Sequence, residues 1–454
     1  MSIQSVNPAT GEVAASFEAY SDEKVQSILN DVAGEWLIWK GKAFAERAGL
    51  LKKAAELLRS RSSKLTELMA LEMGKPISQG EGEANKCALV CDYYADKGEE
   101  MLAPTPVEGA GRKAYITYEP LGTVLTVMPW NFPFWQVLRI AAPSLMAGNA
   151  VVLKHASNVP QCALAIEEIF KDAGFPENIF RTLLIGARQV ESVLDHESVF
   201  AVSLTGSEFA GQKVASAAGA RLKKSVMELG GSDPFIVLDD ADLDEAVKIA
   251  TLSRYGNAGQ TCIAAKRFIV MDGVYDEFIS RFADSMDALK VGDPLDRNTD
   301  MGPMSSGKLR QELQEQVDRC LAAGGKVLRG GSIPEGIGYY YPPTLVTDIL
   351  PDADICQEEL FGPVAMVFRV SSVDEAVSVA NSTPFGLGGS IWSKDENMAE
   401  KVAARIRTGC VFINSLVRSD VNLPFGGIGL SGYGRELGTY GIREFVNVKP
   451  ICIG

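Results

Sequence analysis

The chain has 454 residues, 46% hydrophobic and 22% charged, a composition typical of a large soluble protein with several domains that excludes global disorder and a small disulfide-stapled fold. With 44 Lys and Arg against 58 Asp and Glu, the formal net charge is −14, so a nucleic-acid partner would need a local basic patch, and we find none. Its two histidines, His155 and His196, are too few for a multi-histidine metal site, and no metal is expected.

The first hundred residues are predicted to be helical. Apolar residues recur at three- and four-residue spacing among charges in Glu35–Leu58 and in Ser62–Leu71. Cys87 and Cys91 follow at a spacing that places both thiols on one face of a helix.

From Gly122 onward, short apolar runs alternate with helical segments of roughly 10–15 residues, a pattern that predicts a parallel sheet wrapped by helices. We expect Gly148 and Gly174 to close two of the helices. The predicted strands are Thr123–Val127, Ala150–Leu153, Thr182–Ile185 and Val199–Leu204, and the predicted helices are Trp135–Met146, Gln161–Asp172 and Glu208–Ala218.

A second series of the same kind begins near Ser225, with the boundary between the two units near Leu229. Asp242 is expected to cap its first helix. The predicted strands are Phe235–Leu238, Phe268–Val270 and Val411–Ile413, and the predicted helices are Asp242–Tyr255, Tyr275–Leu289, Leu309–Ala323, Val373–Asn381 and Asn397–Ile406.

Two strand-like pieces, Ala114–Tyr118 and Phe445–Ile453, lie outside both units. Peripheral strands of this sort often pair across a subunit interface, so we expect a homodimer or a homotetramer.

Two glycine-rich motifs resemble nucleotide-binding loops but lack the necessary context. Gly427–Gly432 reads G-x-G-x-x-G, yet Pro424 precedes it and the chain ends too soon for the acidic residue that the dinucleotide motif requires. Gly302–Lys308 is followed by Leu309, where a phosphate loop needs Ser or Thr. Both are expected to be turns.

The cysteines and the start of the chain indicate the compartment. None of the eight cysteines forms a Cys-x-x-Cys pair, as expected in a reducing environment. The first residues lack the basic and apolar regions of a secretory signal, and the uncharged stretch Pro120–Leu138 carries prolines that a lipid-exposed helix cannot accommodate. We expect a cytoplasmic protein with no membrane partner.

One cysteine has the surroundings of a nucleophile. Cys262 ends the flexible polar segment Gly256–Cys262, where backbone dipoles can lower the pKa of a thiol. Cys91, Cys162, Cys320 and Cys410 lie in apolar patterns and are interpreted as small buried hydrophobes.

Together these motifs resemble the aldehyde dehydrogenase superfamily. Gly259–Cys262 is similar to its catalytic-cysteine signature and Met227–Gly231 to its general-base signature. Further similar blocks occur in the family's order along essentially the whole chain: Asn7–Gly11, Pro129–Pro133, Leu204–Ser207, Glu358–Pro363, Pro424–Gly427 and Ser431–Glu436.

The resemblance implies a covalent mechanism. Cys262 attacks an aldehyde, and the side-chain amide of Asn131 and the backbone N–H of Cys262 stabilise the thiohemiacetal oxyanion. Hydride then passes to the nicotinamide, and Glu228 activates the water that hydrolyses the thioester. Glu436 resembles a second carboxylate that relays protons.

The resemblance also implies a cofactor site. Thr205, Gly206 and Ser207 open a helix whose N-terminus suits a phosphate. Ser157 stands where many NAD-dependent members carry a glutamate, and Lys154 can attract a 2′-phosphate, so we predict NADP, with NAD as the weaker alternative. The other cofactor-binding residues implied are Trp130, Leu229, Glu359 and Phe361.

For the substrate, Arg139 and Ser419 resemble the carboxylate clamp of family members that act on succinic semialdehyde, with Trp135 as a wall of the tunnel. Some relatives add an arginine at the position of Gly256, and Arg254 or Arg418 could substitute for it. Ala264 occupies the place of a second, redox-active cysteine, so no redox switch is expected. Gly429 replaces a common lysine, and the sequence assigns no consequence to this replacement.

The implied activity is therefore oxidation of succinic semialdehyde, a small aldehyde carrying a carboxylate, to succinate. The alternatives are a dehydrogenase of a glutarate-like or neutral aldehyde, and a catalytically idle binding protein. The expected fold class is α/β, with two Rossmann-like parallel-sheet domains and a small β oligomerisation arm. The expected divisions are 1–112 with 122–228 for the cofactor, 229–423 for catalysis, and 113–121 with 424–454 for bridging and oligomerisation.

Overall fold

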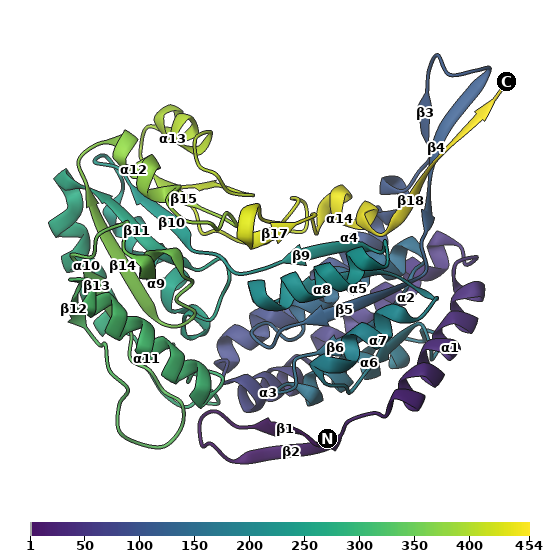
Figure 1. Ribbon diagram of the computed structural model, residues 1–454, viewed down its shortest axis with the longest axis horizontal. Helices are drawn as coiled ribbons and strands as arrows, with labels where there is room; N and C mark the ends of the chain where they lie inside the picture. The colour runs from purple at the N-terminus through teal and green to yellow at the C-terminus, as the bar shows by residue number, and fades with distance from the viewer. Residues whose placement is uncertain (1) are drawn as a thin grey trace.

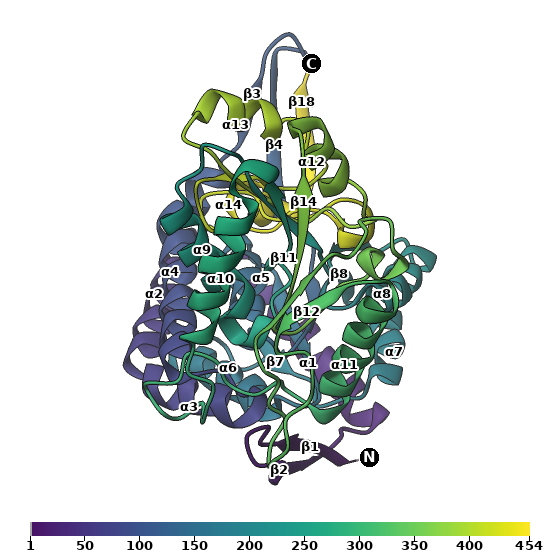
Figure 2. The ribbon, with the colours of Figure 1, turned by 90° about the vertical axis from the view of Figure 1, so that its left-hand side faces the viewer.

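The computed structural model describes residues 2–454 and shows two lobes, each built around its own sheet (Figure 1). A narrow three-stranded arm projects from one side of the molecule. The N-terminal hairpin of β1 (Ser2–Val6) and β2 (Val13–Glu18) lies on the opposite side, as the view turned by 90° also shows (Figure 2). Within residues 2–454, no helix is long and apolar enough to cross a membrane.

The first sheet has six strands in the order β17-β9-β8-β5-β6-β7, parallel except for β17. The chain runs outward from β5 to β7 and then returns to place β8 on the other side of β5. The carboxyl ends of β5 and β8 therefore flank a switch point, where open α/β sheets bind ligands. The bounds are β5 (Thr123–Met128), β6 (Ala150–His155), β7 (Phe180–Thr182), β8 (Val199–Thr205), β9 (Lys224–Glu228) and β17 (Gly432–Tyr433).

Helices α1 to α8 pack around this sheet, and every residue of the central one, α5, is buried. The left-handed Gly148 (φ 96°) ends α5, as predicted, and Gly174 (φ 91°) comes just after the end of α6. The helices are α1 (Asp22–Trp39), α2 (Phe44–Ser60), α3 (Ser62–Met73), α4 (Ile77–Met101), α5 (Trp135–Ala147), α6 (Pro160–Asp172), α7 (Val190–Asp195) and α8 (Glu208–Ala220).

Two of the predicted elements are wrong. Glu35–Leu58 is not one helix, because a turn at residues 40–43 separates α1 from α2, and Arg47 fixes this turn by donating to the carbonyl of Lys42 at 2.6 Å. The strand predicted at Thr182–Ile185 ends at Thr182. After one more bond from Leu183 to the Leu153 carbonyl (2.7 Å), the chain turns away from the sheet.

The second sheet has seven strands in the order β12-β13-β14-β11-β10-β15-β16, parallel except for β12. Asp242 caps α9, as predicted, by accepting from the N–H groups of Asp244 and Glu245. The elements are β10 (Asp233–Val237), β11 (Ala265–Met271), β12 (Lys326–Arg329), β13 (Thr344–Thr347), β14 (Val364–Val370), β15 (Ser390–Trp392), β16 (Phe412–Ile413), α9 (Leu243–Tyr255), α10 (Tyr275–Asp287), α11 (Gly307–Ala322), α12 (Val373–Ala380) and α13 (Glu396–Ala403).

The C-terminal segment connects both lobes to the arm. It contributes β17 beside β9, then α14 (Gly438–Glu444), and ends in β18 (Val446–Ile453). In the arm, β18 and β3 (Thr105–Val107) flank β4 (Lys113–Pro120) in antiparallel register. The two peripheral strands predicted from the sequence thus pair with each other within one chain, and the open edges of the arm are those of β3 and β18.

The two glycine-rich decoy motifs form local turns, as expected. Gly429–Ser431 is a short 3-10 turn, and a side chain at Gly432 would lie 1.9 Å from the carbonyl oxygen of Met227. In the other motif, Ser306 caps α11 by accepting from Leu309, so its hydroxyl serves the helix.

Candidate active site

The loop before β11 holds Cys262 in a strained, closely packed conformation. Asn257 and Ala258 both adopt left-handed backbone angles (φ 54° and 53°), and Gly259 follows at φ 71°. A Cβ at Gly259 would lie 2.3 Å from the carbonyl oxygen of Gly362, so no larger residue fits. Strain of this kind persists only where surrounding structure enforces it, which is common at functional sites.

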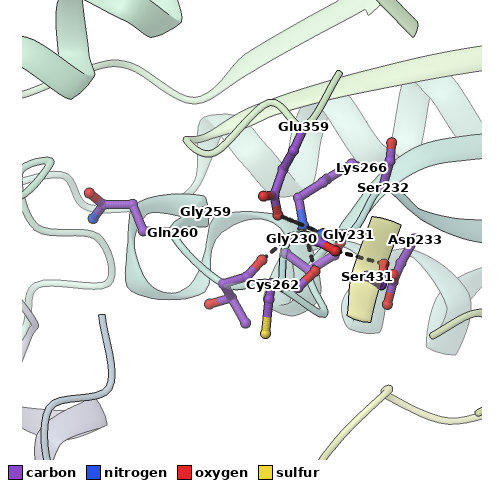
Figure 3. Close-up of polar contacts among 12 residues, drawn as sticks. Gly230, Gly231, Ser232, Asp233, Gly259, Gln260, Cys262, Lys266, Glu359 and Ser431 are labelled. Carbon is purple, nitrogen blue, oxygen red and sulfur yellow. Dashed lines mark hydrogen bonds and ion pairs between the residues drawn. The ribbon is translucent and has the colours of Figure 1, made fainter. Parts of the chain in front are cut away.

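Two fully buried cations hold this loop by donating to backbone carbonyls. Lys266 donates to the carbonyls of Thr261 (2.9 Å) and Cys262 (2.7 Å), while Arg254 donates to those of Gly259 (2.6 Å) and Gly362 (2.8 Å). Figure 3 shows the sulfur of Cys262 pointing away from the polar contacts around Lys266. Another buried cation, Arg267, donates to the carbonyls of Ser232, Val379 and Ala380, which lie outside this loop.

The thiol of Cys262 is protonated in the resting structure. Burial raises its pKa to about 12, and the positive charges of Arg139 and Lys266 only partly oppose this effect. The expectation that backbone dipoles lower this pKa is therefore wrong for the resting structure, because desolvation of the thiolate outweighs them. The thiol needs a proton acceptor when it reacts.

Asn131 follows β5 and packs directly against the cysteine loop. Its Nδ2 donates to the backbone carbonyl of Gln260 at 2.9 Å, and its backbone carbonyl accepts from Nδ2 of Asn257 at 2.9 Å. The second Nδ2 hydrogen has no acceptor among residues 2–454, so it is available to an oxyanion. Nε2 of His155 bonds to the carbonyl of Pro133 (2.8 Å) and so holds the loop that carries Asn131. Burial lowers the pKa of His155 to about 4, so the imidazole is neutral.

Helix α4 supports the site along one face, a role that no sequence motif indicated. Gln79 accepts from the N–H of Asn257 at 2.8 Å, and Glu83 accepts from those of Phe134 (2.9 Å) and Trp135 (3.0 Å). Lys75, just before the helix, forms a buried ion pair with Glu83. Residues 79, 83 and 86 are spaced so that they lie on one face of a helix, and this spacing can be read from the sequence. It does not show which residues they contact.

Glu228, the last residue of β9, is buried without a partner for either carboxylate oxygen among the described residues. Burial raises its pKa well above the usual value, and the nearby Glu436 raises it further, while Arg139 and Arg435 act in the opposite direction. A raised pKa increases the proton affinity of this carboxylate, which suits a group that transfers protons.

Arg139, predicted as a substrate clamp, is already paired with a protein carboxylate. Its guanidinium forms a buried ion pair with Glu436 and donates to the hydroxyl of Thr205 at 3.3 Å. A buried arginine is costly unless it meets an anion. Glu436 is that anion, so the substrate is not needed to explain the burial of Arg139.

A cavity of about 320 Å³ brings several predicted residues together beside the cysteine. Cys262, Arg139, Trp135 and Ser419 line it, with Phe132 and Phe425 among the apolar walls. Trp135 Nε1 donates to the hydroxyl of Ser419 at 3.0 Å, so the two residues are fixed relative to each other. Lys86 also lines the cavity, although no sequence pattern predicted it there.

The two arginines considered as substitutes for an arginine at Gly256 lie in different places. Arg254 is fully buried and binds only backbone carbonyls, so its assignment to the substrate is wrong. Arg418 is exposed and lines the cavity, where it donates to the hydroxyl of Ser415 at 3.0 Å.

The predicted phosphate-binding residues lie at or just after the carboxyl ends of β6 and β8 in the first sheet. Lys154 pairs with Val127 at the end of β6, is more than nine-tenths buried, and has no acceptor or carboxylate partner among residues 2–454. Burial lowers its pKa. Ser207 caps α8 by accepting from Ala210, and Ser157 is exposed after β6. An unpaired ammonium and the N-terminus of a helix are each suited to the phosphates of NADP.

The other residues predicted for the cofactor are each held in place by close contacts. Glu359 accepts from the N–H of Gly231 at 3.1 Å and pairs with Lys266 at 3.0 Å, as Figure 3 shows. Trp130 and Phe361 meet edge to face with ring centroids 5.9 Å apart. Leu229 packs against Gly211 of α8, where a Cβ would lie 2.5 Å from its methyl group.

Comparison with known proteins gives consistent results. A model of the aldehyde dehydrogenase family matches residues 1–451. A curated relative from Synechocystis sp., named probable succinate-semialdehyde dehydrogenase (NADP+), is 51% identical, and the match covers both chains completely. The solved structure of succinic semialdehyde dehydrogenase from Streptococcus pyogenes with NADP+ is 40% identical, with 99% of each chain covered and a TM-score of 0.97. The solved structure of Gox0499 is 44% identical over both complete chains, with a TM-score of 0.99.

Proposed function

We propose that this chain, which belongs to the aldehyde dehydrogenase family, is an NADP-dependent dehydrogenase that oxidises succinic semialdehyde to succinate. The observation that carries the proposal is the cavity in which the candidate nucleophile Cys262 lies with polar and cationic groups able to bind a carboxylate.

Cys262 forms the covalent bond to the substrate. Its sulfur attacks the aldehyde carbon and the thiol proton leaves to a base, which gives a thiohemiacetal with negative charge on the former carbonyl oxygen. The free hydrogen of Asn131 Nδ2 and the backbone N–H of Cys262 are the proposed donors to that oxygen. Because the Gln260 carbonyl fixes the amide beforehand, little reorganisation is needed when charge develops.

Glu228 is the proposed base for the second half of the reaction. NADP, when bound, supplies the hydride acceptor, and loss of hydride leaves a thioester on Cys262. Glu228 then takes a proton from water, which attacks the thioester carbon and releases succinate and the free thiol. The raised pKa of Glu228 suits this task. Glu436, whose charge contributes to raising that pKa, is the proposed proton relay.

Lys154 and Ser157 are proposed to select NADP. The buried, unpaired ammonium of Lys154 attracts phosphate, and the neutral Ser157 leaves room for it without repulsion. Trp130, Leu229, Glu359 and Phe361 are proposed for the rest of the cofactor, with Gly206, Ser207 and the N-terminus of α8 for its diphosphate. Thr205 is buried, and its hydroxyl accepts from Arg139.

The proposed assembly is a homodimer or homotetramer in the cytoplasm. The arm formed by β3, β4 and β18 leaves two open edges, which are suited to pairing with another chain. All eight cysteines are unpaired, which supports a reducing compartment. We also propose the division into a cofactor domain, a catalytic domain and bridging strands, with its boundary near Leu229.

A substrate panel followed at the absorbance of NADPH tests the proposal. We expect kcat/KM for succinic semialdehyde to exceed that for butanal, which has the same chain length and no carboxylate, and NADP+ to be preferred over NAD+. Equal kcat/KM for the two aldehydes would show that the enzyme does not recognise a carboxylate.

A further inference from the structure

Lys86 lies on the face of α4 that forms one wall of the cavity containing Cys262. Its ammonium stands 4.2 Å from the ring centroid of Trp135 and donates to the hydroxyl of Ser419 at 2.8 Å. Both contacts fix the position of the charge, and neither neutralises it.

The hydrogen bonds of Ser419 leave a donor directed elsewhere. Its oxygen accepts from Lys86 at 2.8 Å and from Trp135 Nε1 at 3.0 Å, and the residue is 5% exposed. Two accepted bonds occupy both lone pairs, so its own hydrogen must be donated, and residues 2–454 supply no acceptor for it. A buried hydroxyl donor beside an ammonium with further free hydrogens is suited to a carboxylate.

The charges around the cavity lead to the same conclusion. Arg139 is occupied by Glu436, whereas no carboxylate in the described part of the chain lies within 4.0 Å of the Lys86 nitrogen. Gly256 also lines the cavity and adds no charge to it. Lys86 is therefore a cation on the cavity wall that no carboxylate in the described part of the chain neutralises.

We propose that Lys86, together with Ser419, binds the carboxylate of the substrate and determines the preference for an acidic aldehyde. This inference rests on the proposed function. It transfers the main electrostatic part of recognition from Arg139 to a residue on α4, and it leaves Arg139 to organise Glu436 and the catalytic groups.

The titration of Lys86 provides a second observable. Burial, together with the positive charge of Arg139 on α5, lowers its pKa to about 8. Three acidic groups act in the opposite direction: Glu83 and Cys87 on its own helix, and Asp420 beside Ser419; the exposed Arg418 lines the same cavity. Raising the pH through about 8 removes the Lys86 charge, so the KM for succinic semialdehyde should rise there.

The test compares Lys86→Met with Lys97→Met, a matched control on the exposed side of the same helix that removes an equal charge. For Lys86→Met we expect kcat/KM for succinic semialdehyde to fall about 10- to 100-fold, mainly through KM, as expected for loss of a charge-assisted hydrogen bond. The kcat/KM for butanal should stay within about twofold, as should both values for Lys97→Met.

Rescue variants separate recognition from structural damage. Lys86→Arg should keep most of the selectivity and shift the rise in KM to higher pH. Gly256→Arg in the Lys86→Met background should restore part of the selectivity. A side chain fits there, because a Cβ at Gly256 meets no atom within 4 Å. Unchanged selectivity in Lys86→Met would overturn the inference, whereas a wild-type enzyme that treats both aldehydes alike would overturn the proposed function instead.

Discussion

Arg139 and Glu436 form an ion pair whose side chains are 3% and 0% exposed, and this pair joins α5 to the C-terminal segment. The pair also sets the electrostatics of the site. Arg139 is the largest charge that lowers the pKa of Cys262 and of Glu228, while Glu436 is the largest that raises that of Glu228. A change at either residue therefore affects stability and catalysis together.

Removing one partner should cost more than removing both. Arg139→Met leaves the Glu436 carboxylate buried and uncompensated, so we expect the free energy of unfolding to fall by about 3–5 kcal/mol. Arg139→Met with Glu436→Gln should recover part of this loss. Urea titration followed by tryptophan fluorescence measures both. Arg281→Met, which removes an exposed arginine, is the control and should change stability by about 0.5 kcal/mol or less. Additive effects of the two substitutions would contradict a coupled pair.

The pairing of Arg139 illustrates what sequence patterns can and cannot predict. Local signals worked well: Gly148 ends α5, and Asp242 caps α9. The order of strands and helices could be predicted from alternating apolar runs. Arg139 could be recognised as a buried cation, but its partner is 297 positions later in the chain, and no periodicity relates the two (436 minus 139). The sequence alone does not show whether a buried arginine binds a carboxylate of the substrate or one of the protein.

Sequence patterns also do not predict the contacts made by α4 or the protonation state of Cys262. The N-terminal helices were predicted as a group, yet Gln79, Glu83 and Lys86 bind loops that lie 51 to 333 residues away. The pKa of Cys262 depends on how much water the folded cavity excludes, which flanking glycines do not reveal. The motif predicted which cysteine is placed in the site, but not its protonation state.

The raised thiol pKa predicts how Cys262 reacts with iodoacetamide in the absence of cofactor. While the pH is well below a pKa of about 12, the thiolate fraction rises about tenfold per pH unit. The alkylation rate should therefore keep rising from pH 7 to about pH 10 without a plateau. Mass spectrometry of the Cys262 peptide measures it, with exposed Cys452 as an internal control. A plateau near pH 7 would show that the resting enzyme already holds a thiolate.

Glu228→Gln should separate formation of the thioester from its hydrolysis. The amide has nearly the same shape but cannot accept a proton from water, so we expect kcat to fall about 10²- to 10⁴-fold. One equivalent of NADPH per site should still appear in a burst, and the acylated Cys262 should be visible by mass spectrometry of the intact protein. Cys262→Ala should show neither signal. Full loss of the burst in Glu228→Gln would assign this residue to the first step instead.

Ser157→Glu should weaken NADP+ more than NAD+. A carboxylate there repels the 2′-phosphate and can accept from a ribose hydroxyl, so we expect the KM for NADP+ to rise about 10- to 100-fold, with a much smaller change for NAD+. Ser60→Glu, which adds the same charge at an exposed position of α2, is the control. Equal effects on both cofactors would contradict the assignment of Ser157.

Glu83 should act as a positioning residue for the loop that carries Asn131. It accepts from the first N–H groups of α5 and pairs with buried Lys75, which stacks on Phe132 at 3.8 Å. Glu83→Ala leaves the Lys75 ammonium uncompensated, so stability should fall by about 3–5 kcal/mol. Glu83→Gln keeps one acceptor for these N–H groups and should retain more kcat than Glu83→Ala.

Glu81→Ala, on the exposed side of the same helix, is the control. Since Asn131 is proposed to stabilise the oxyanion, kcat should decrease more than KM changes. A change in KM alone would show that Glu83 only shapes the cavity.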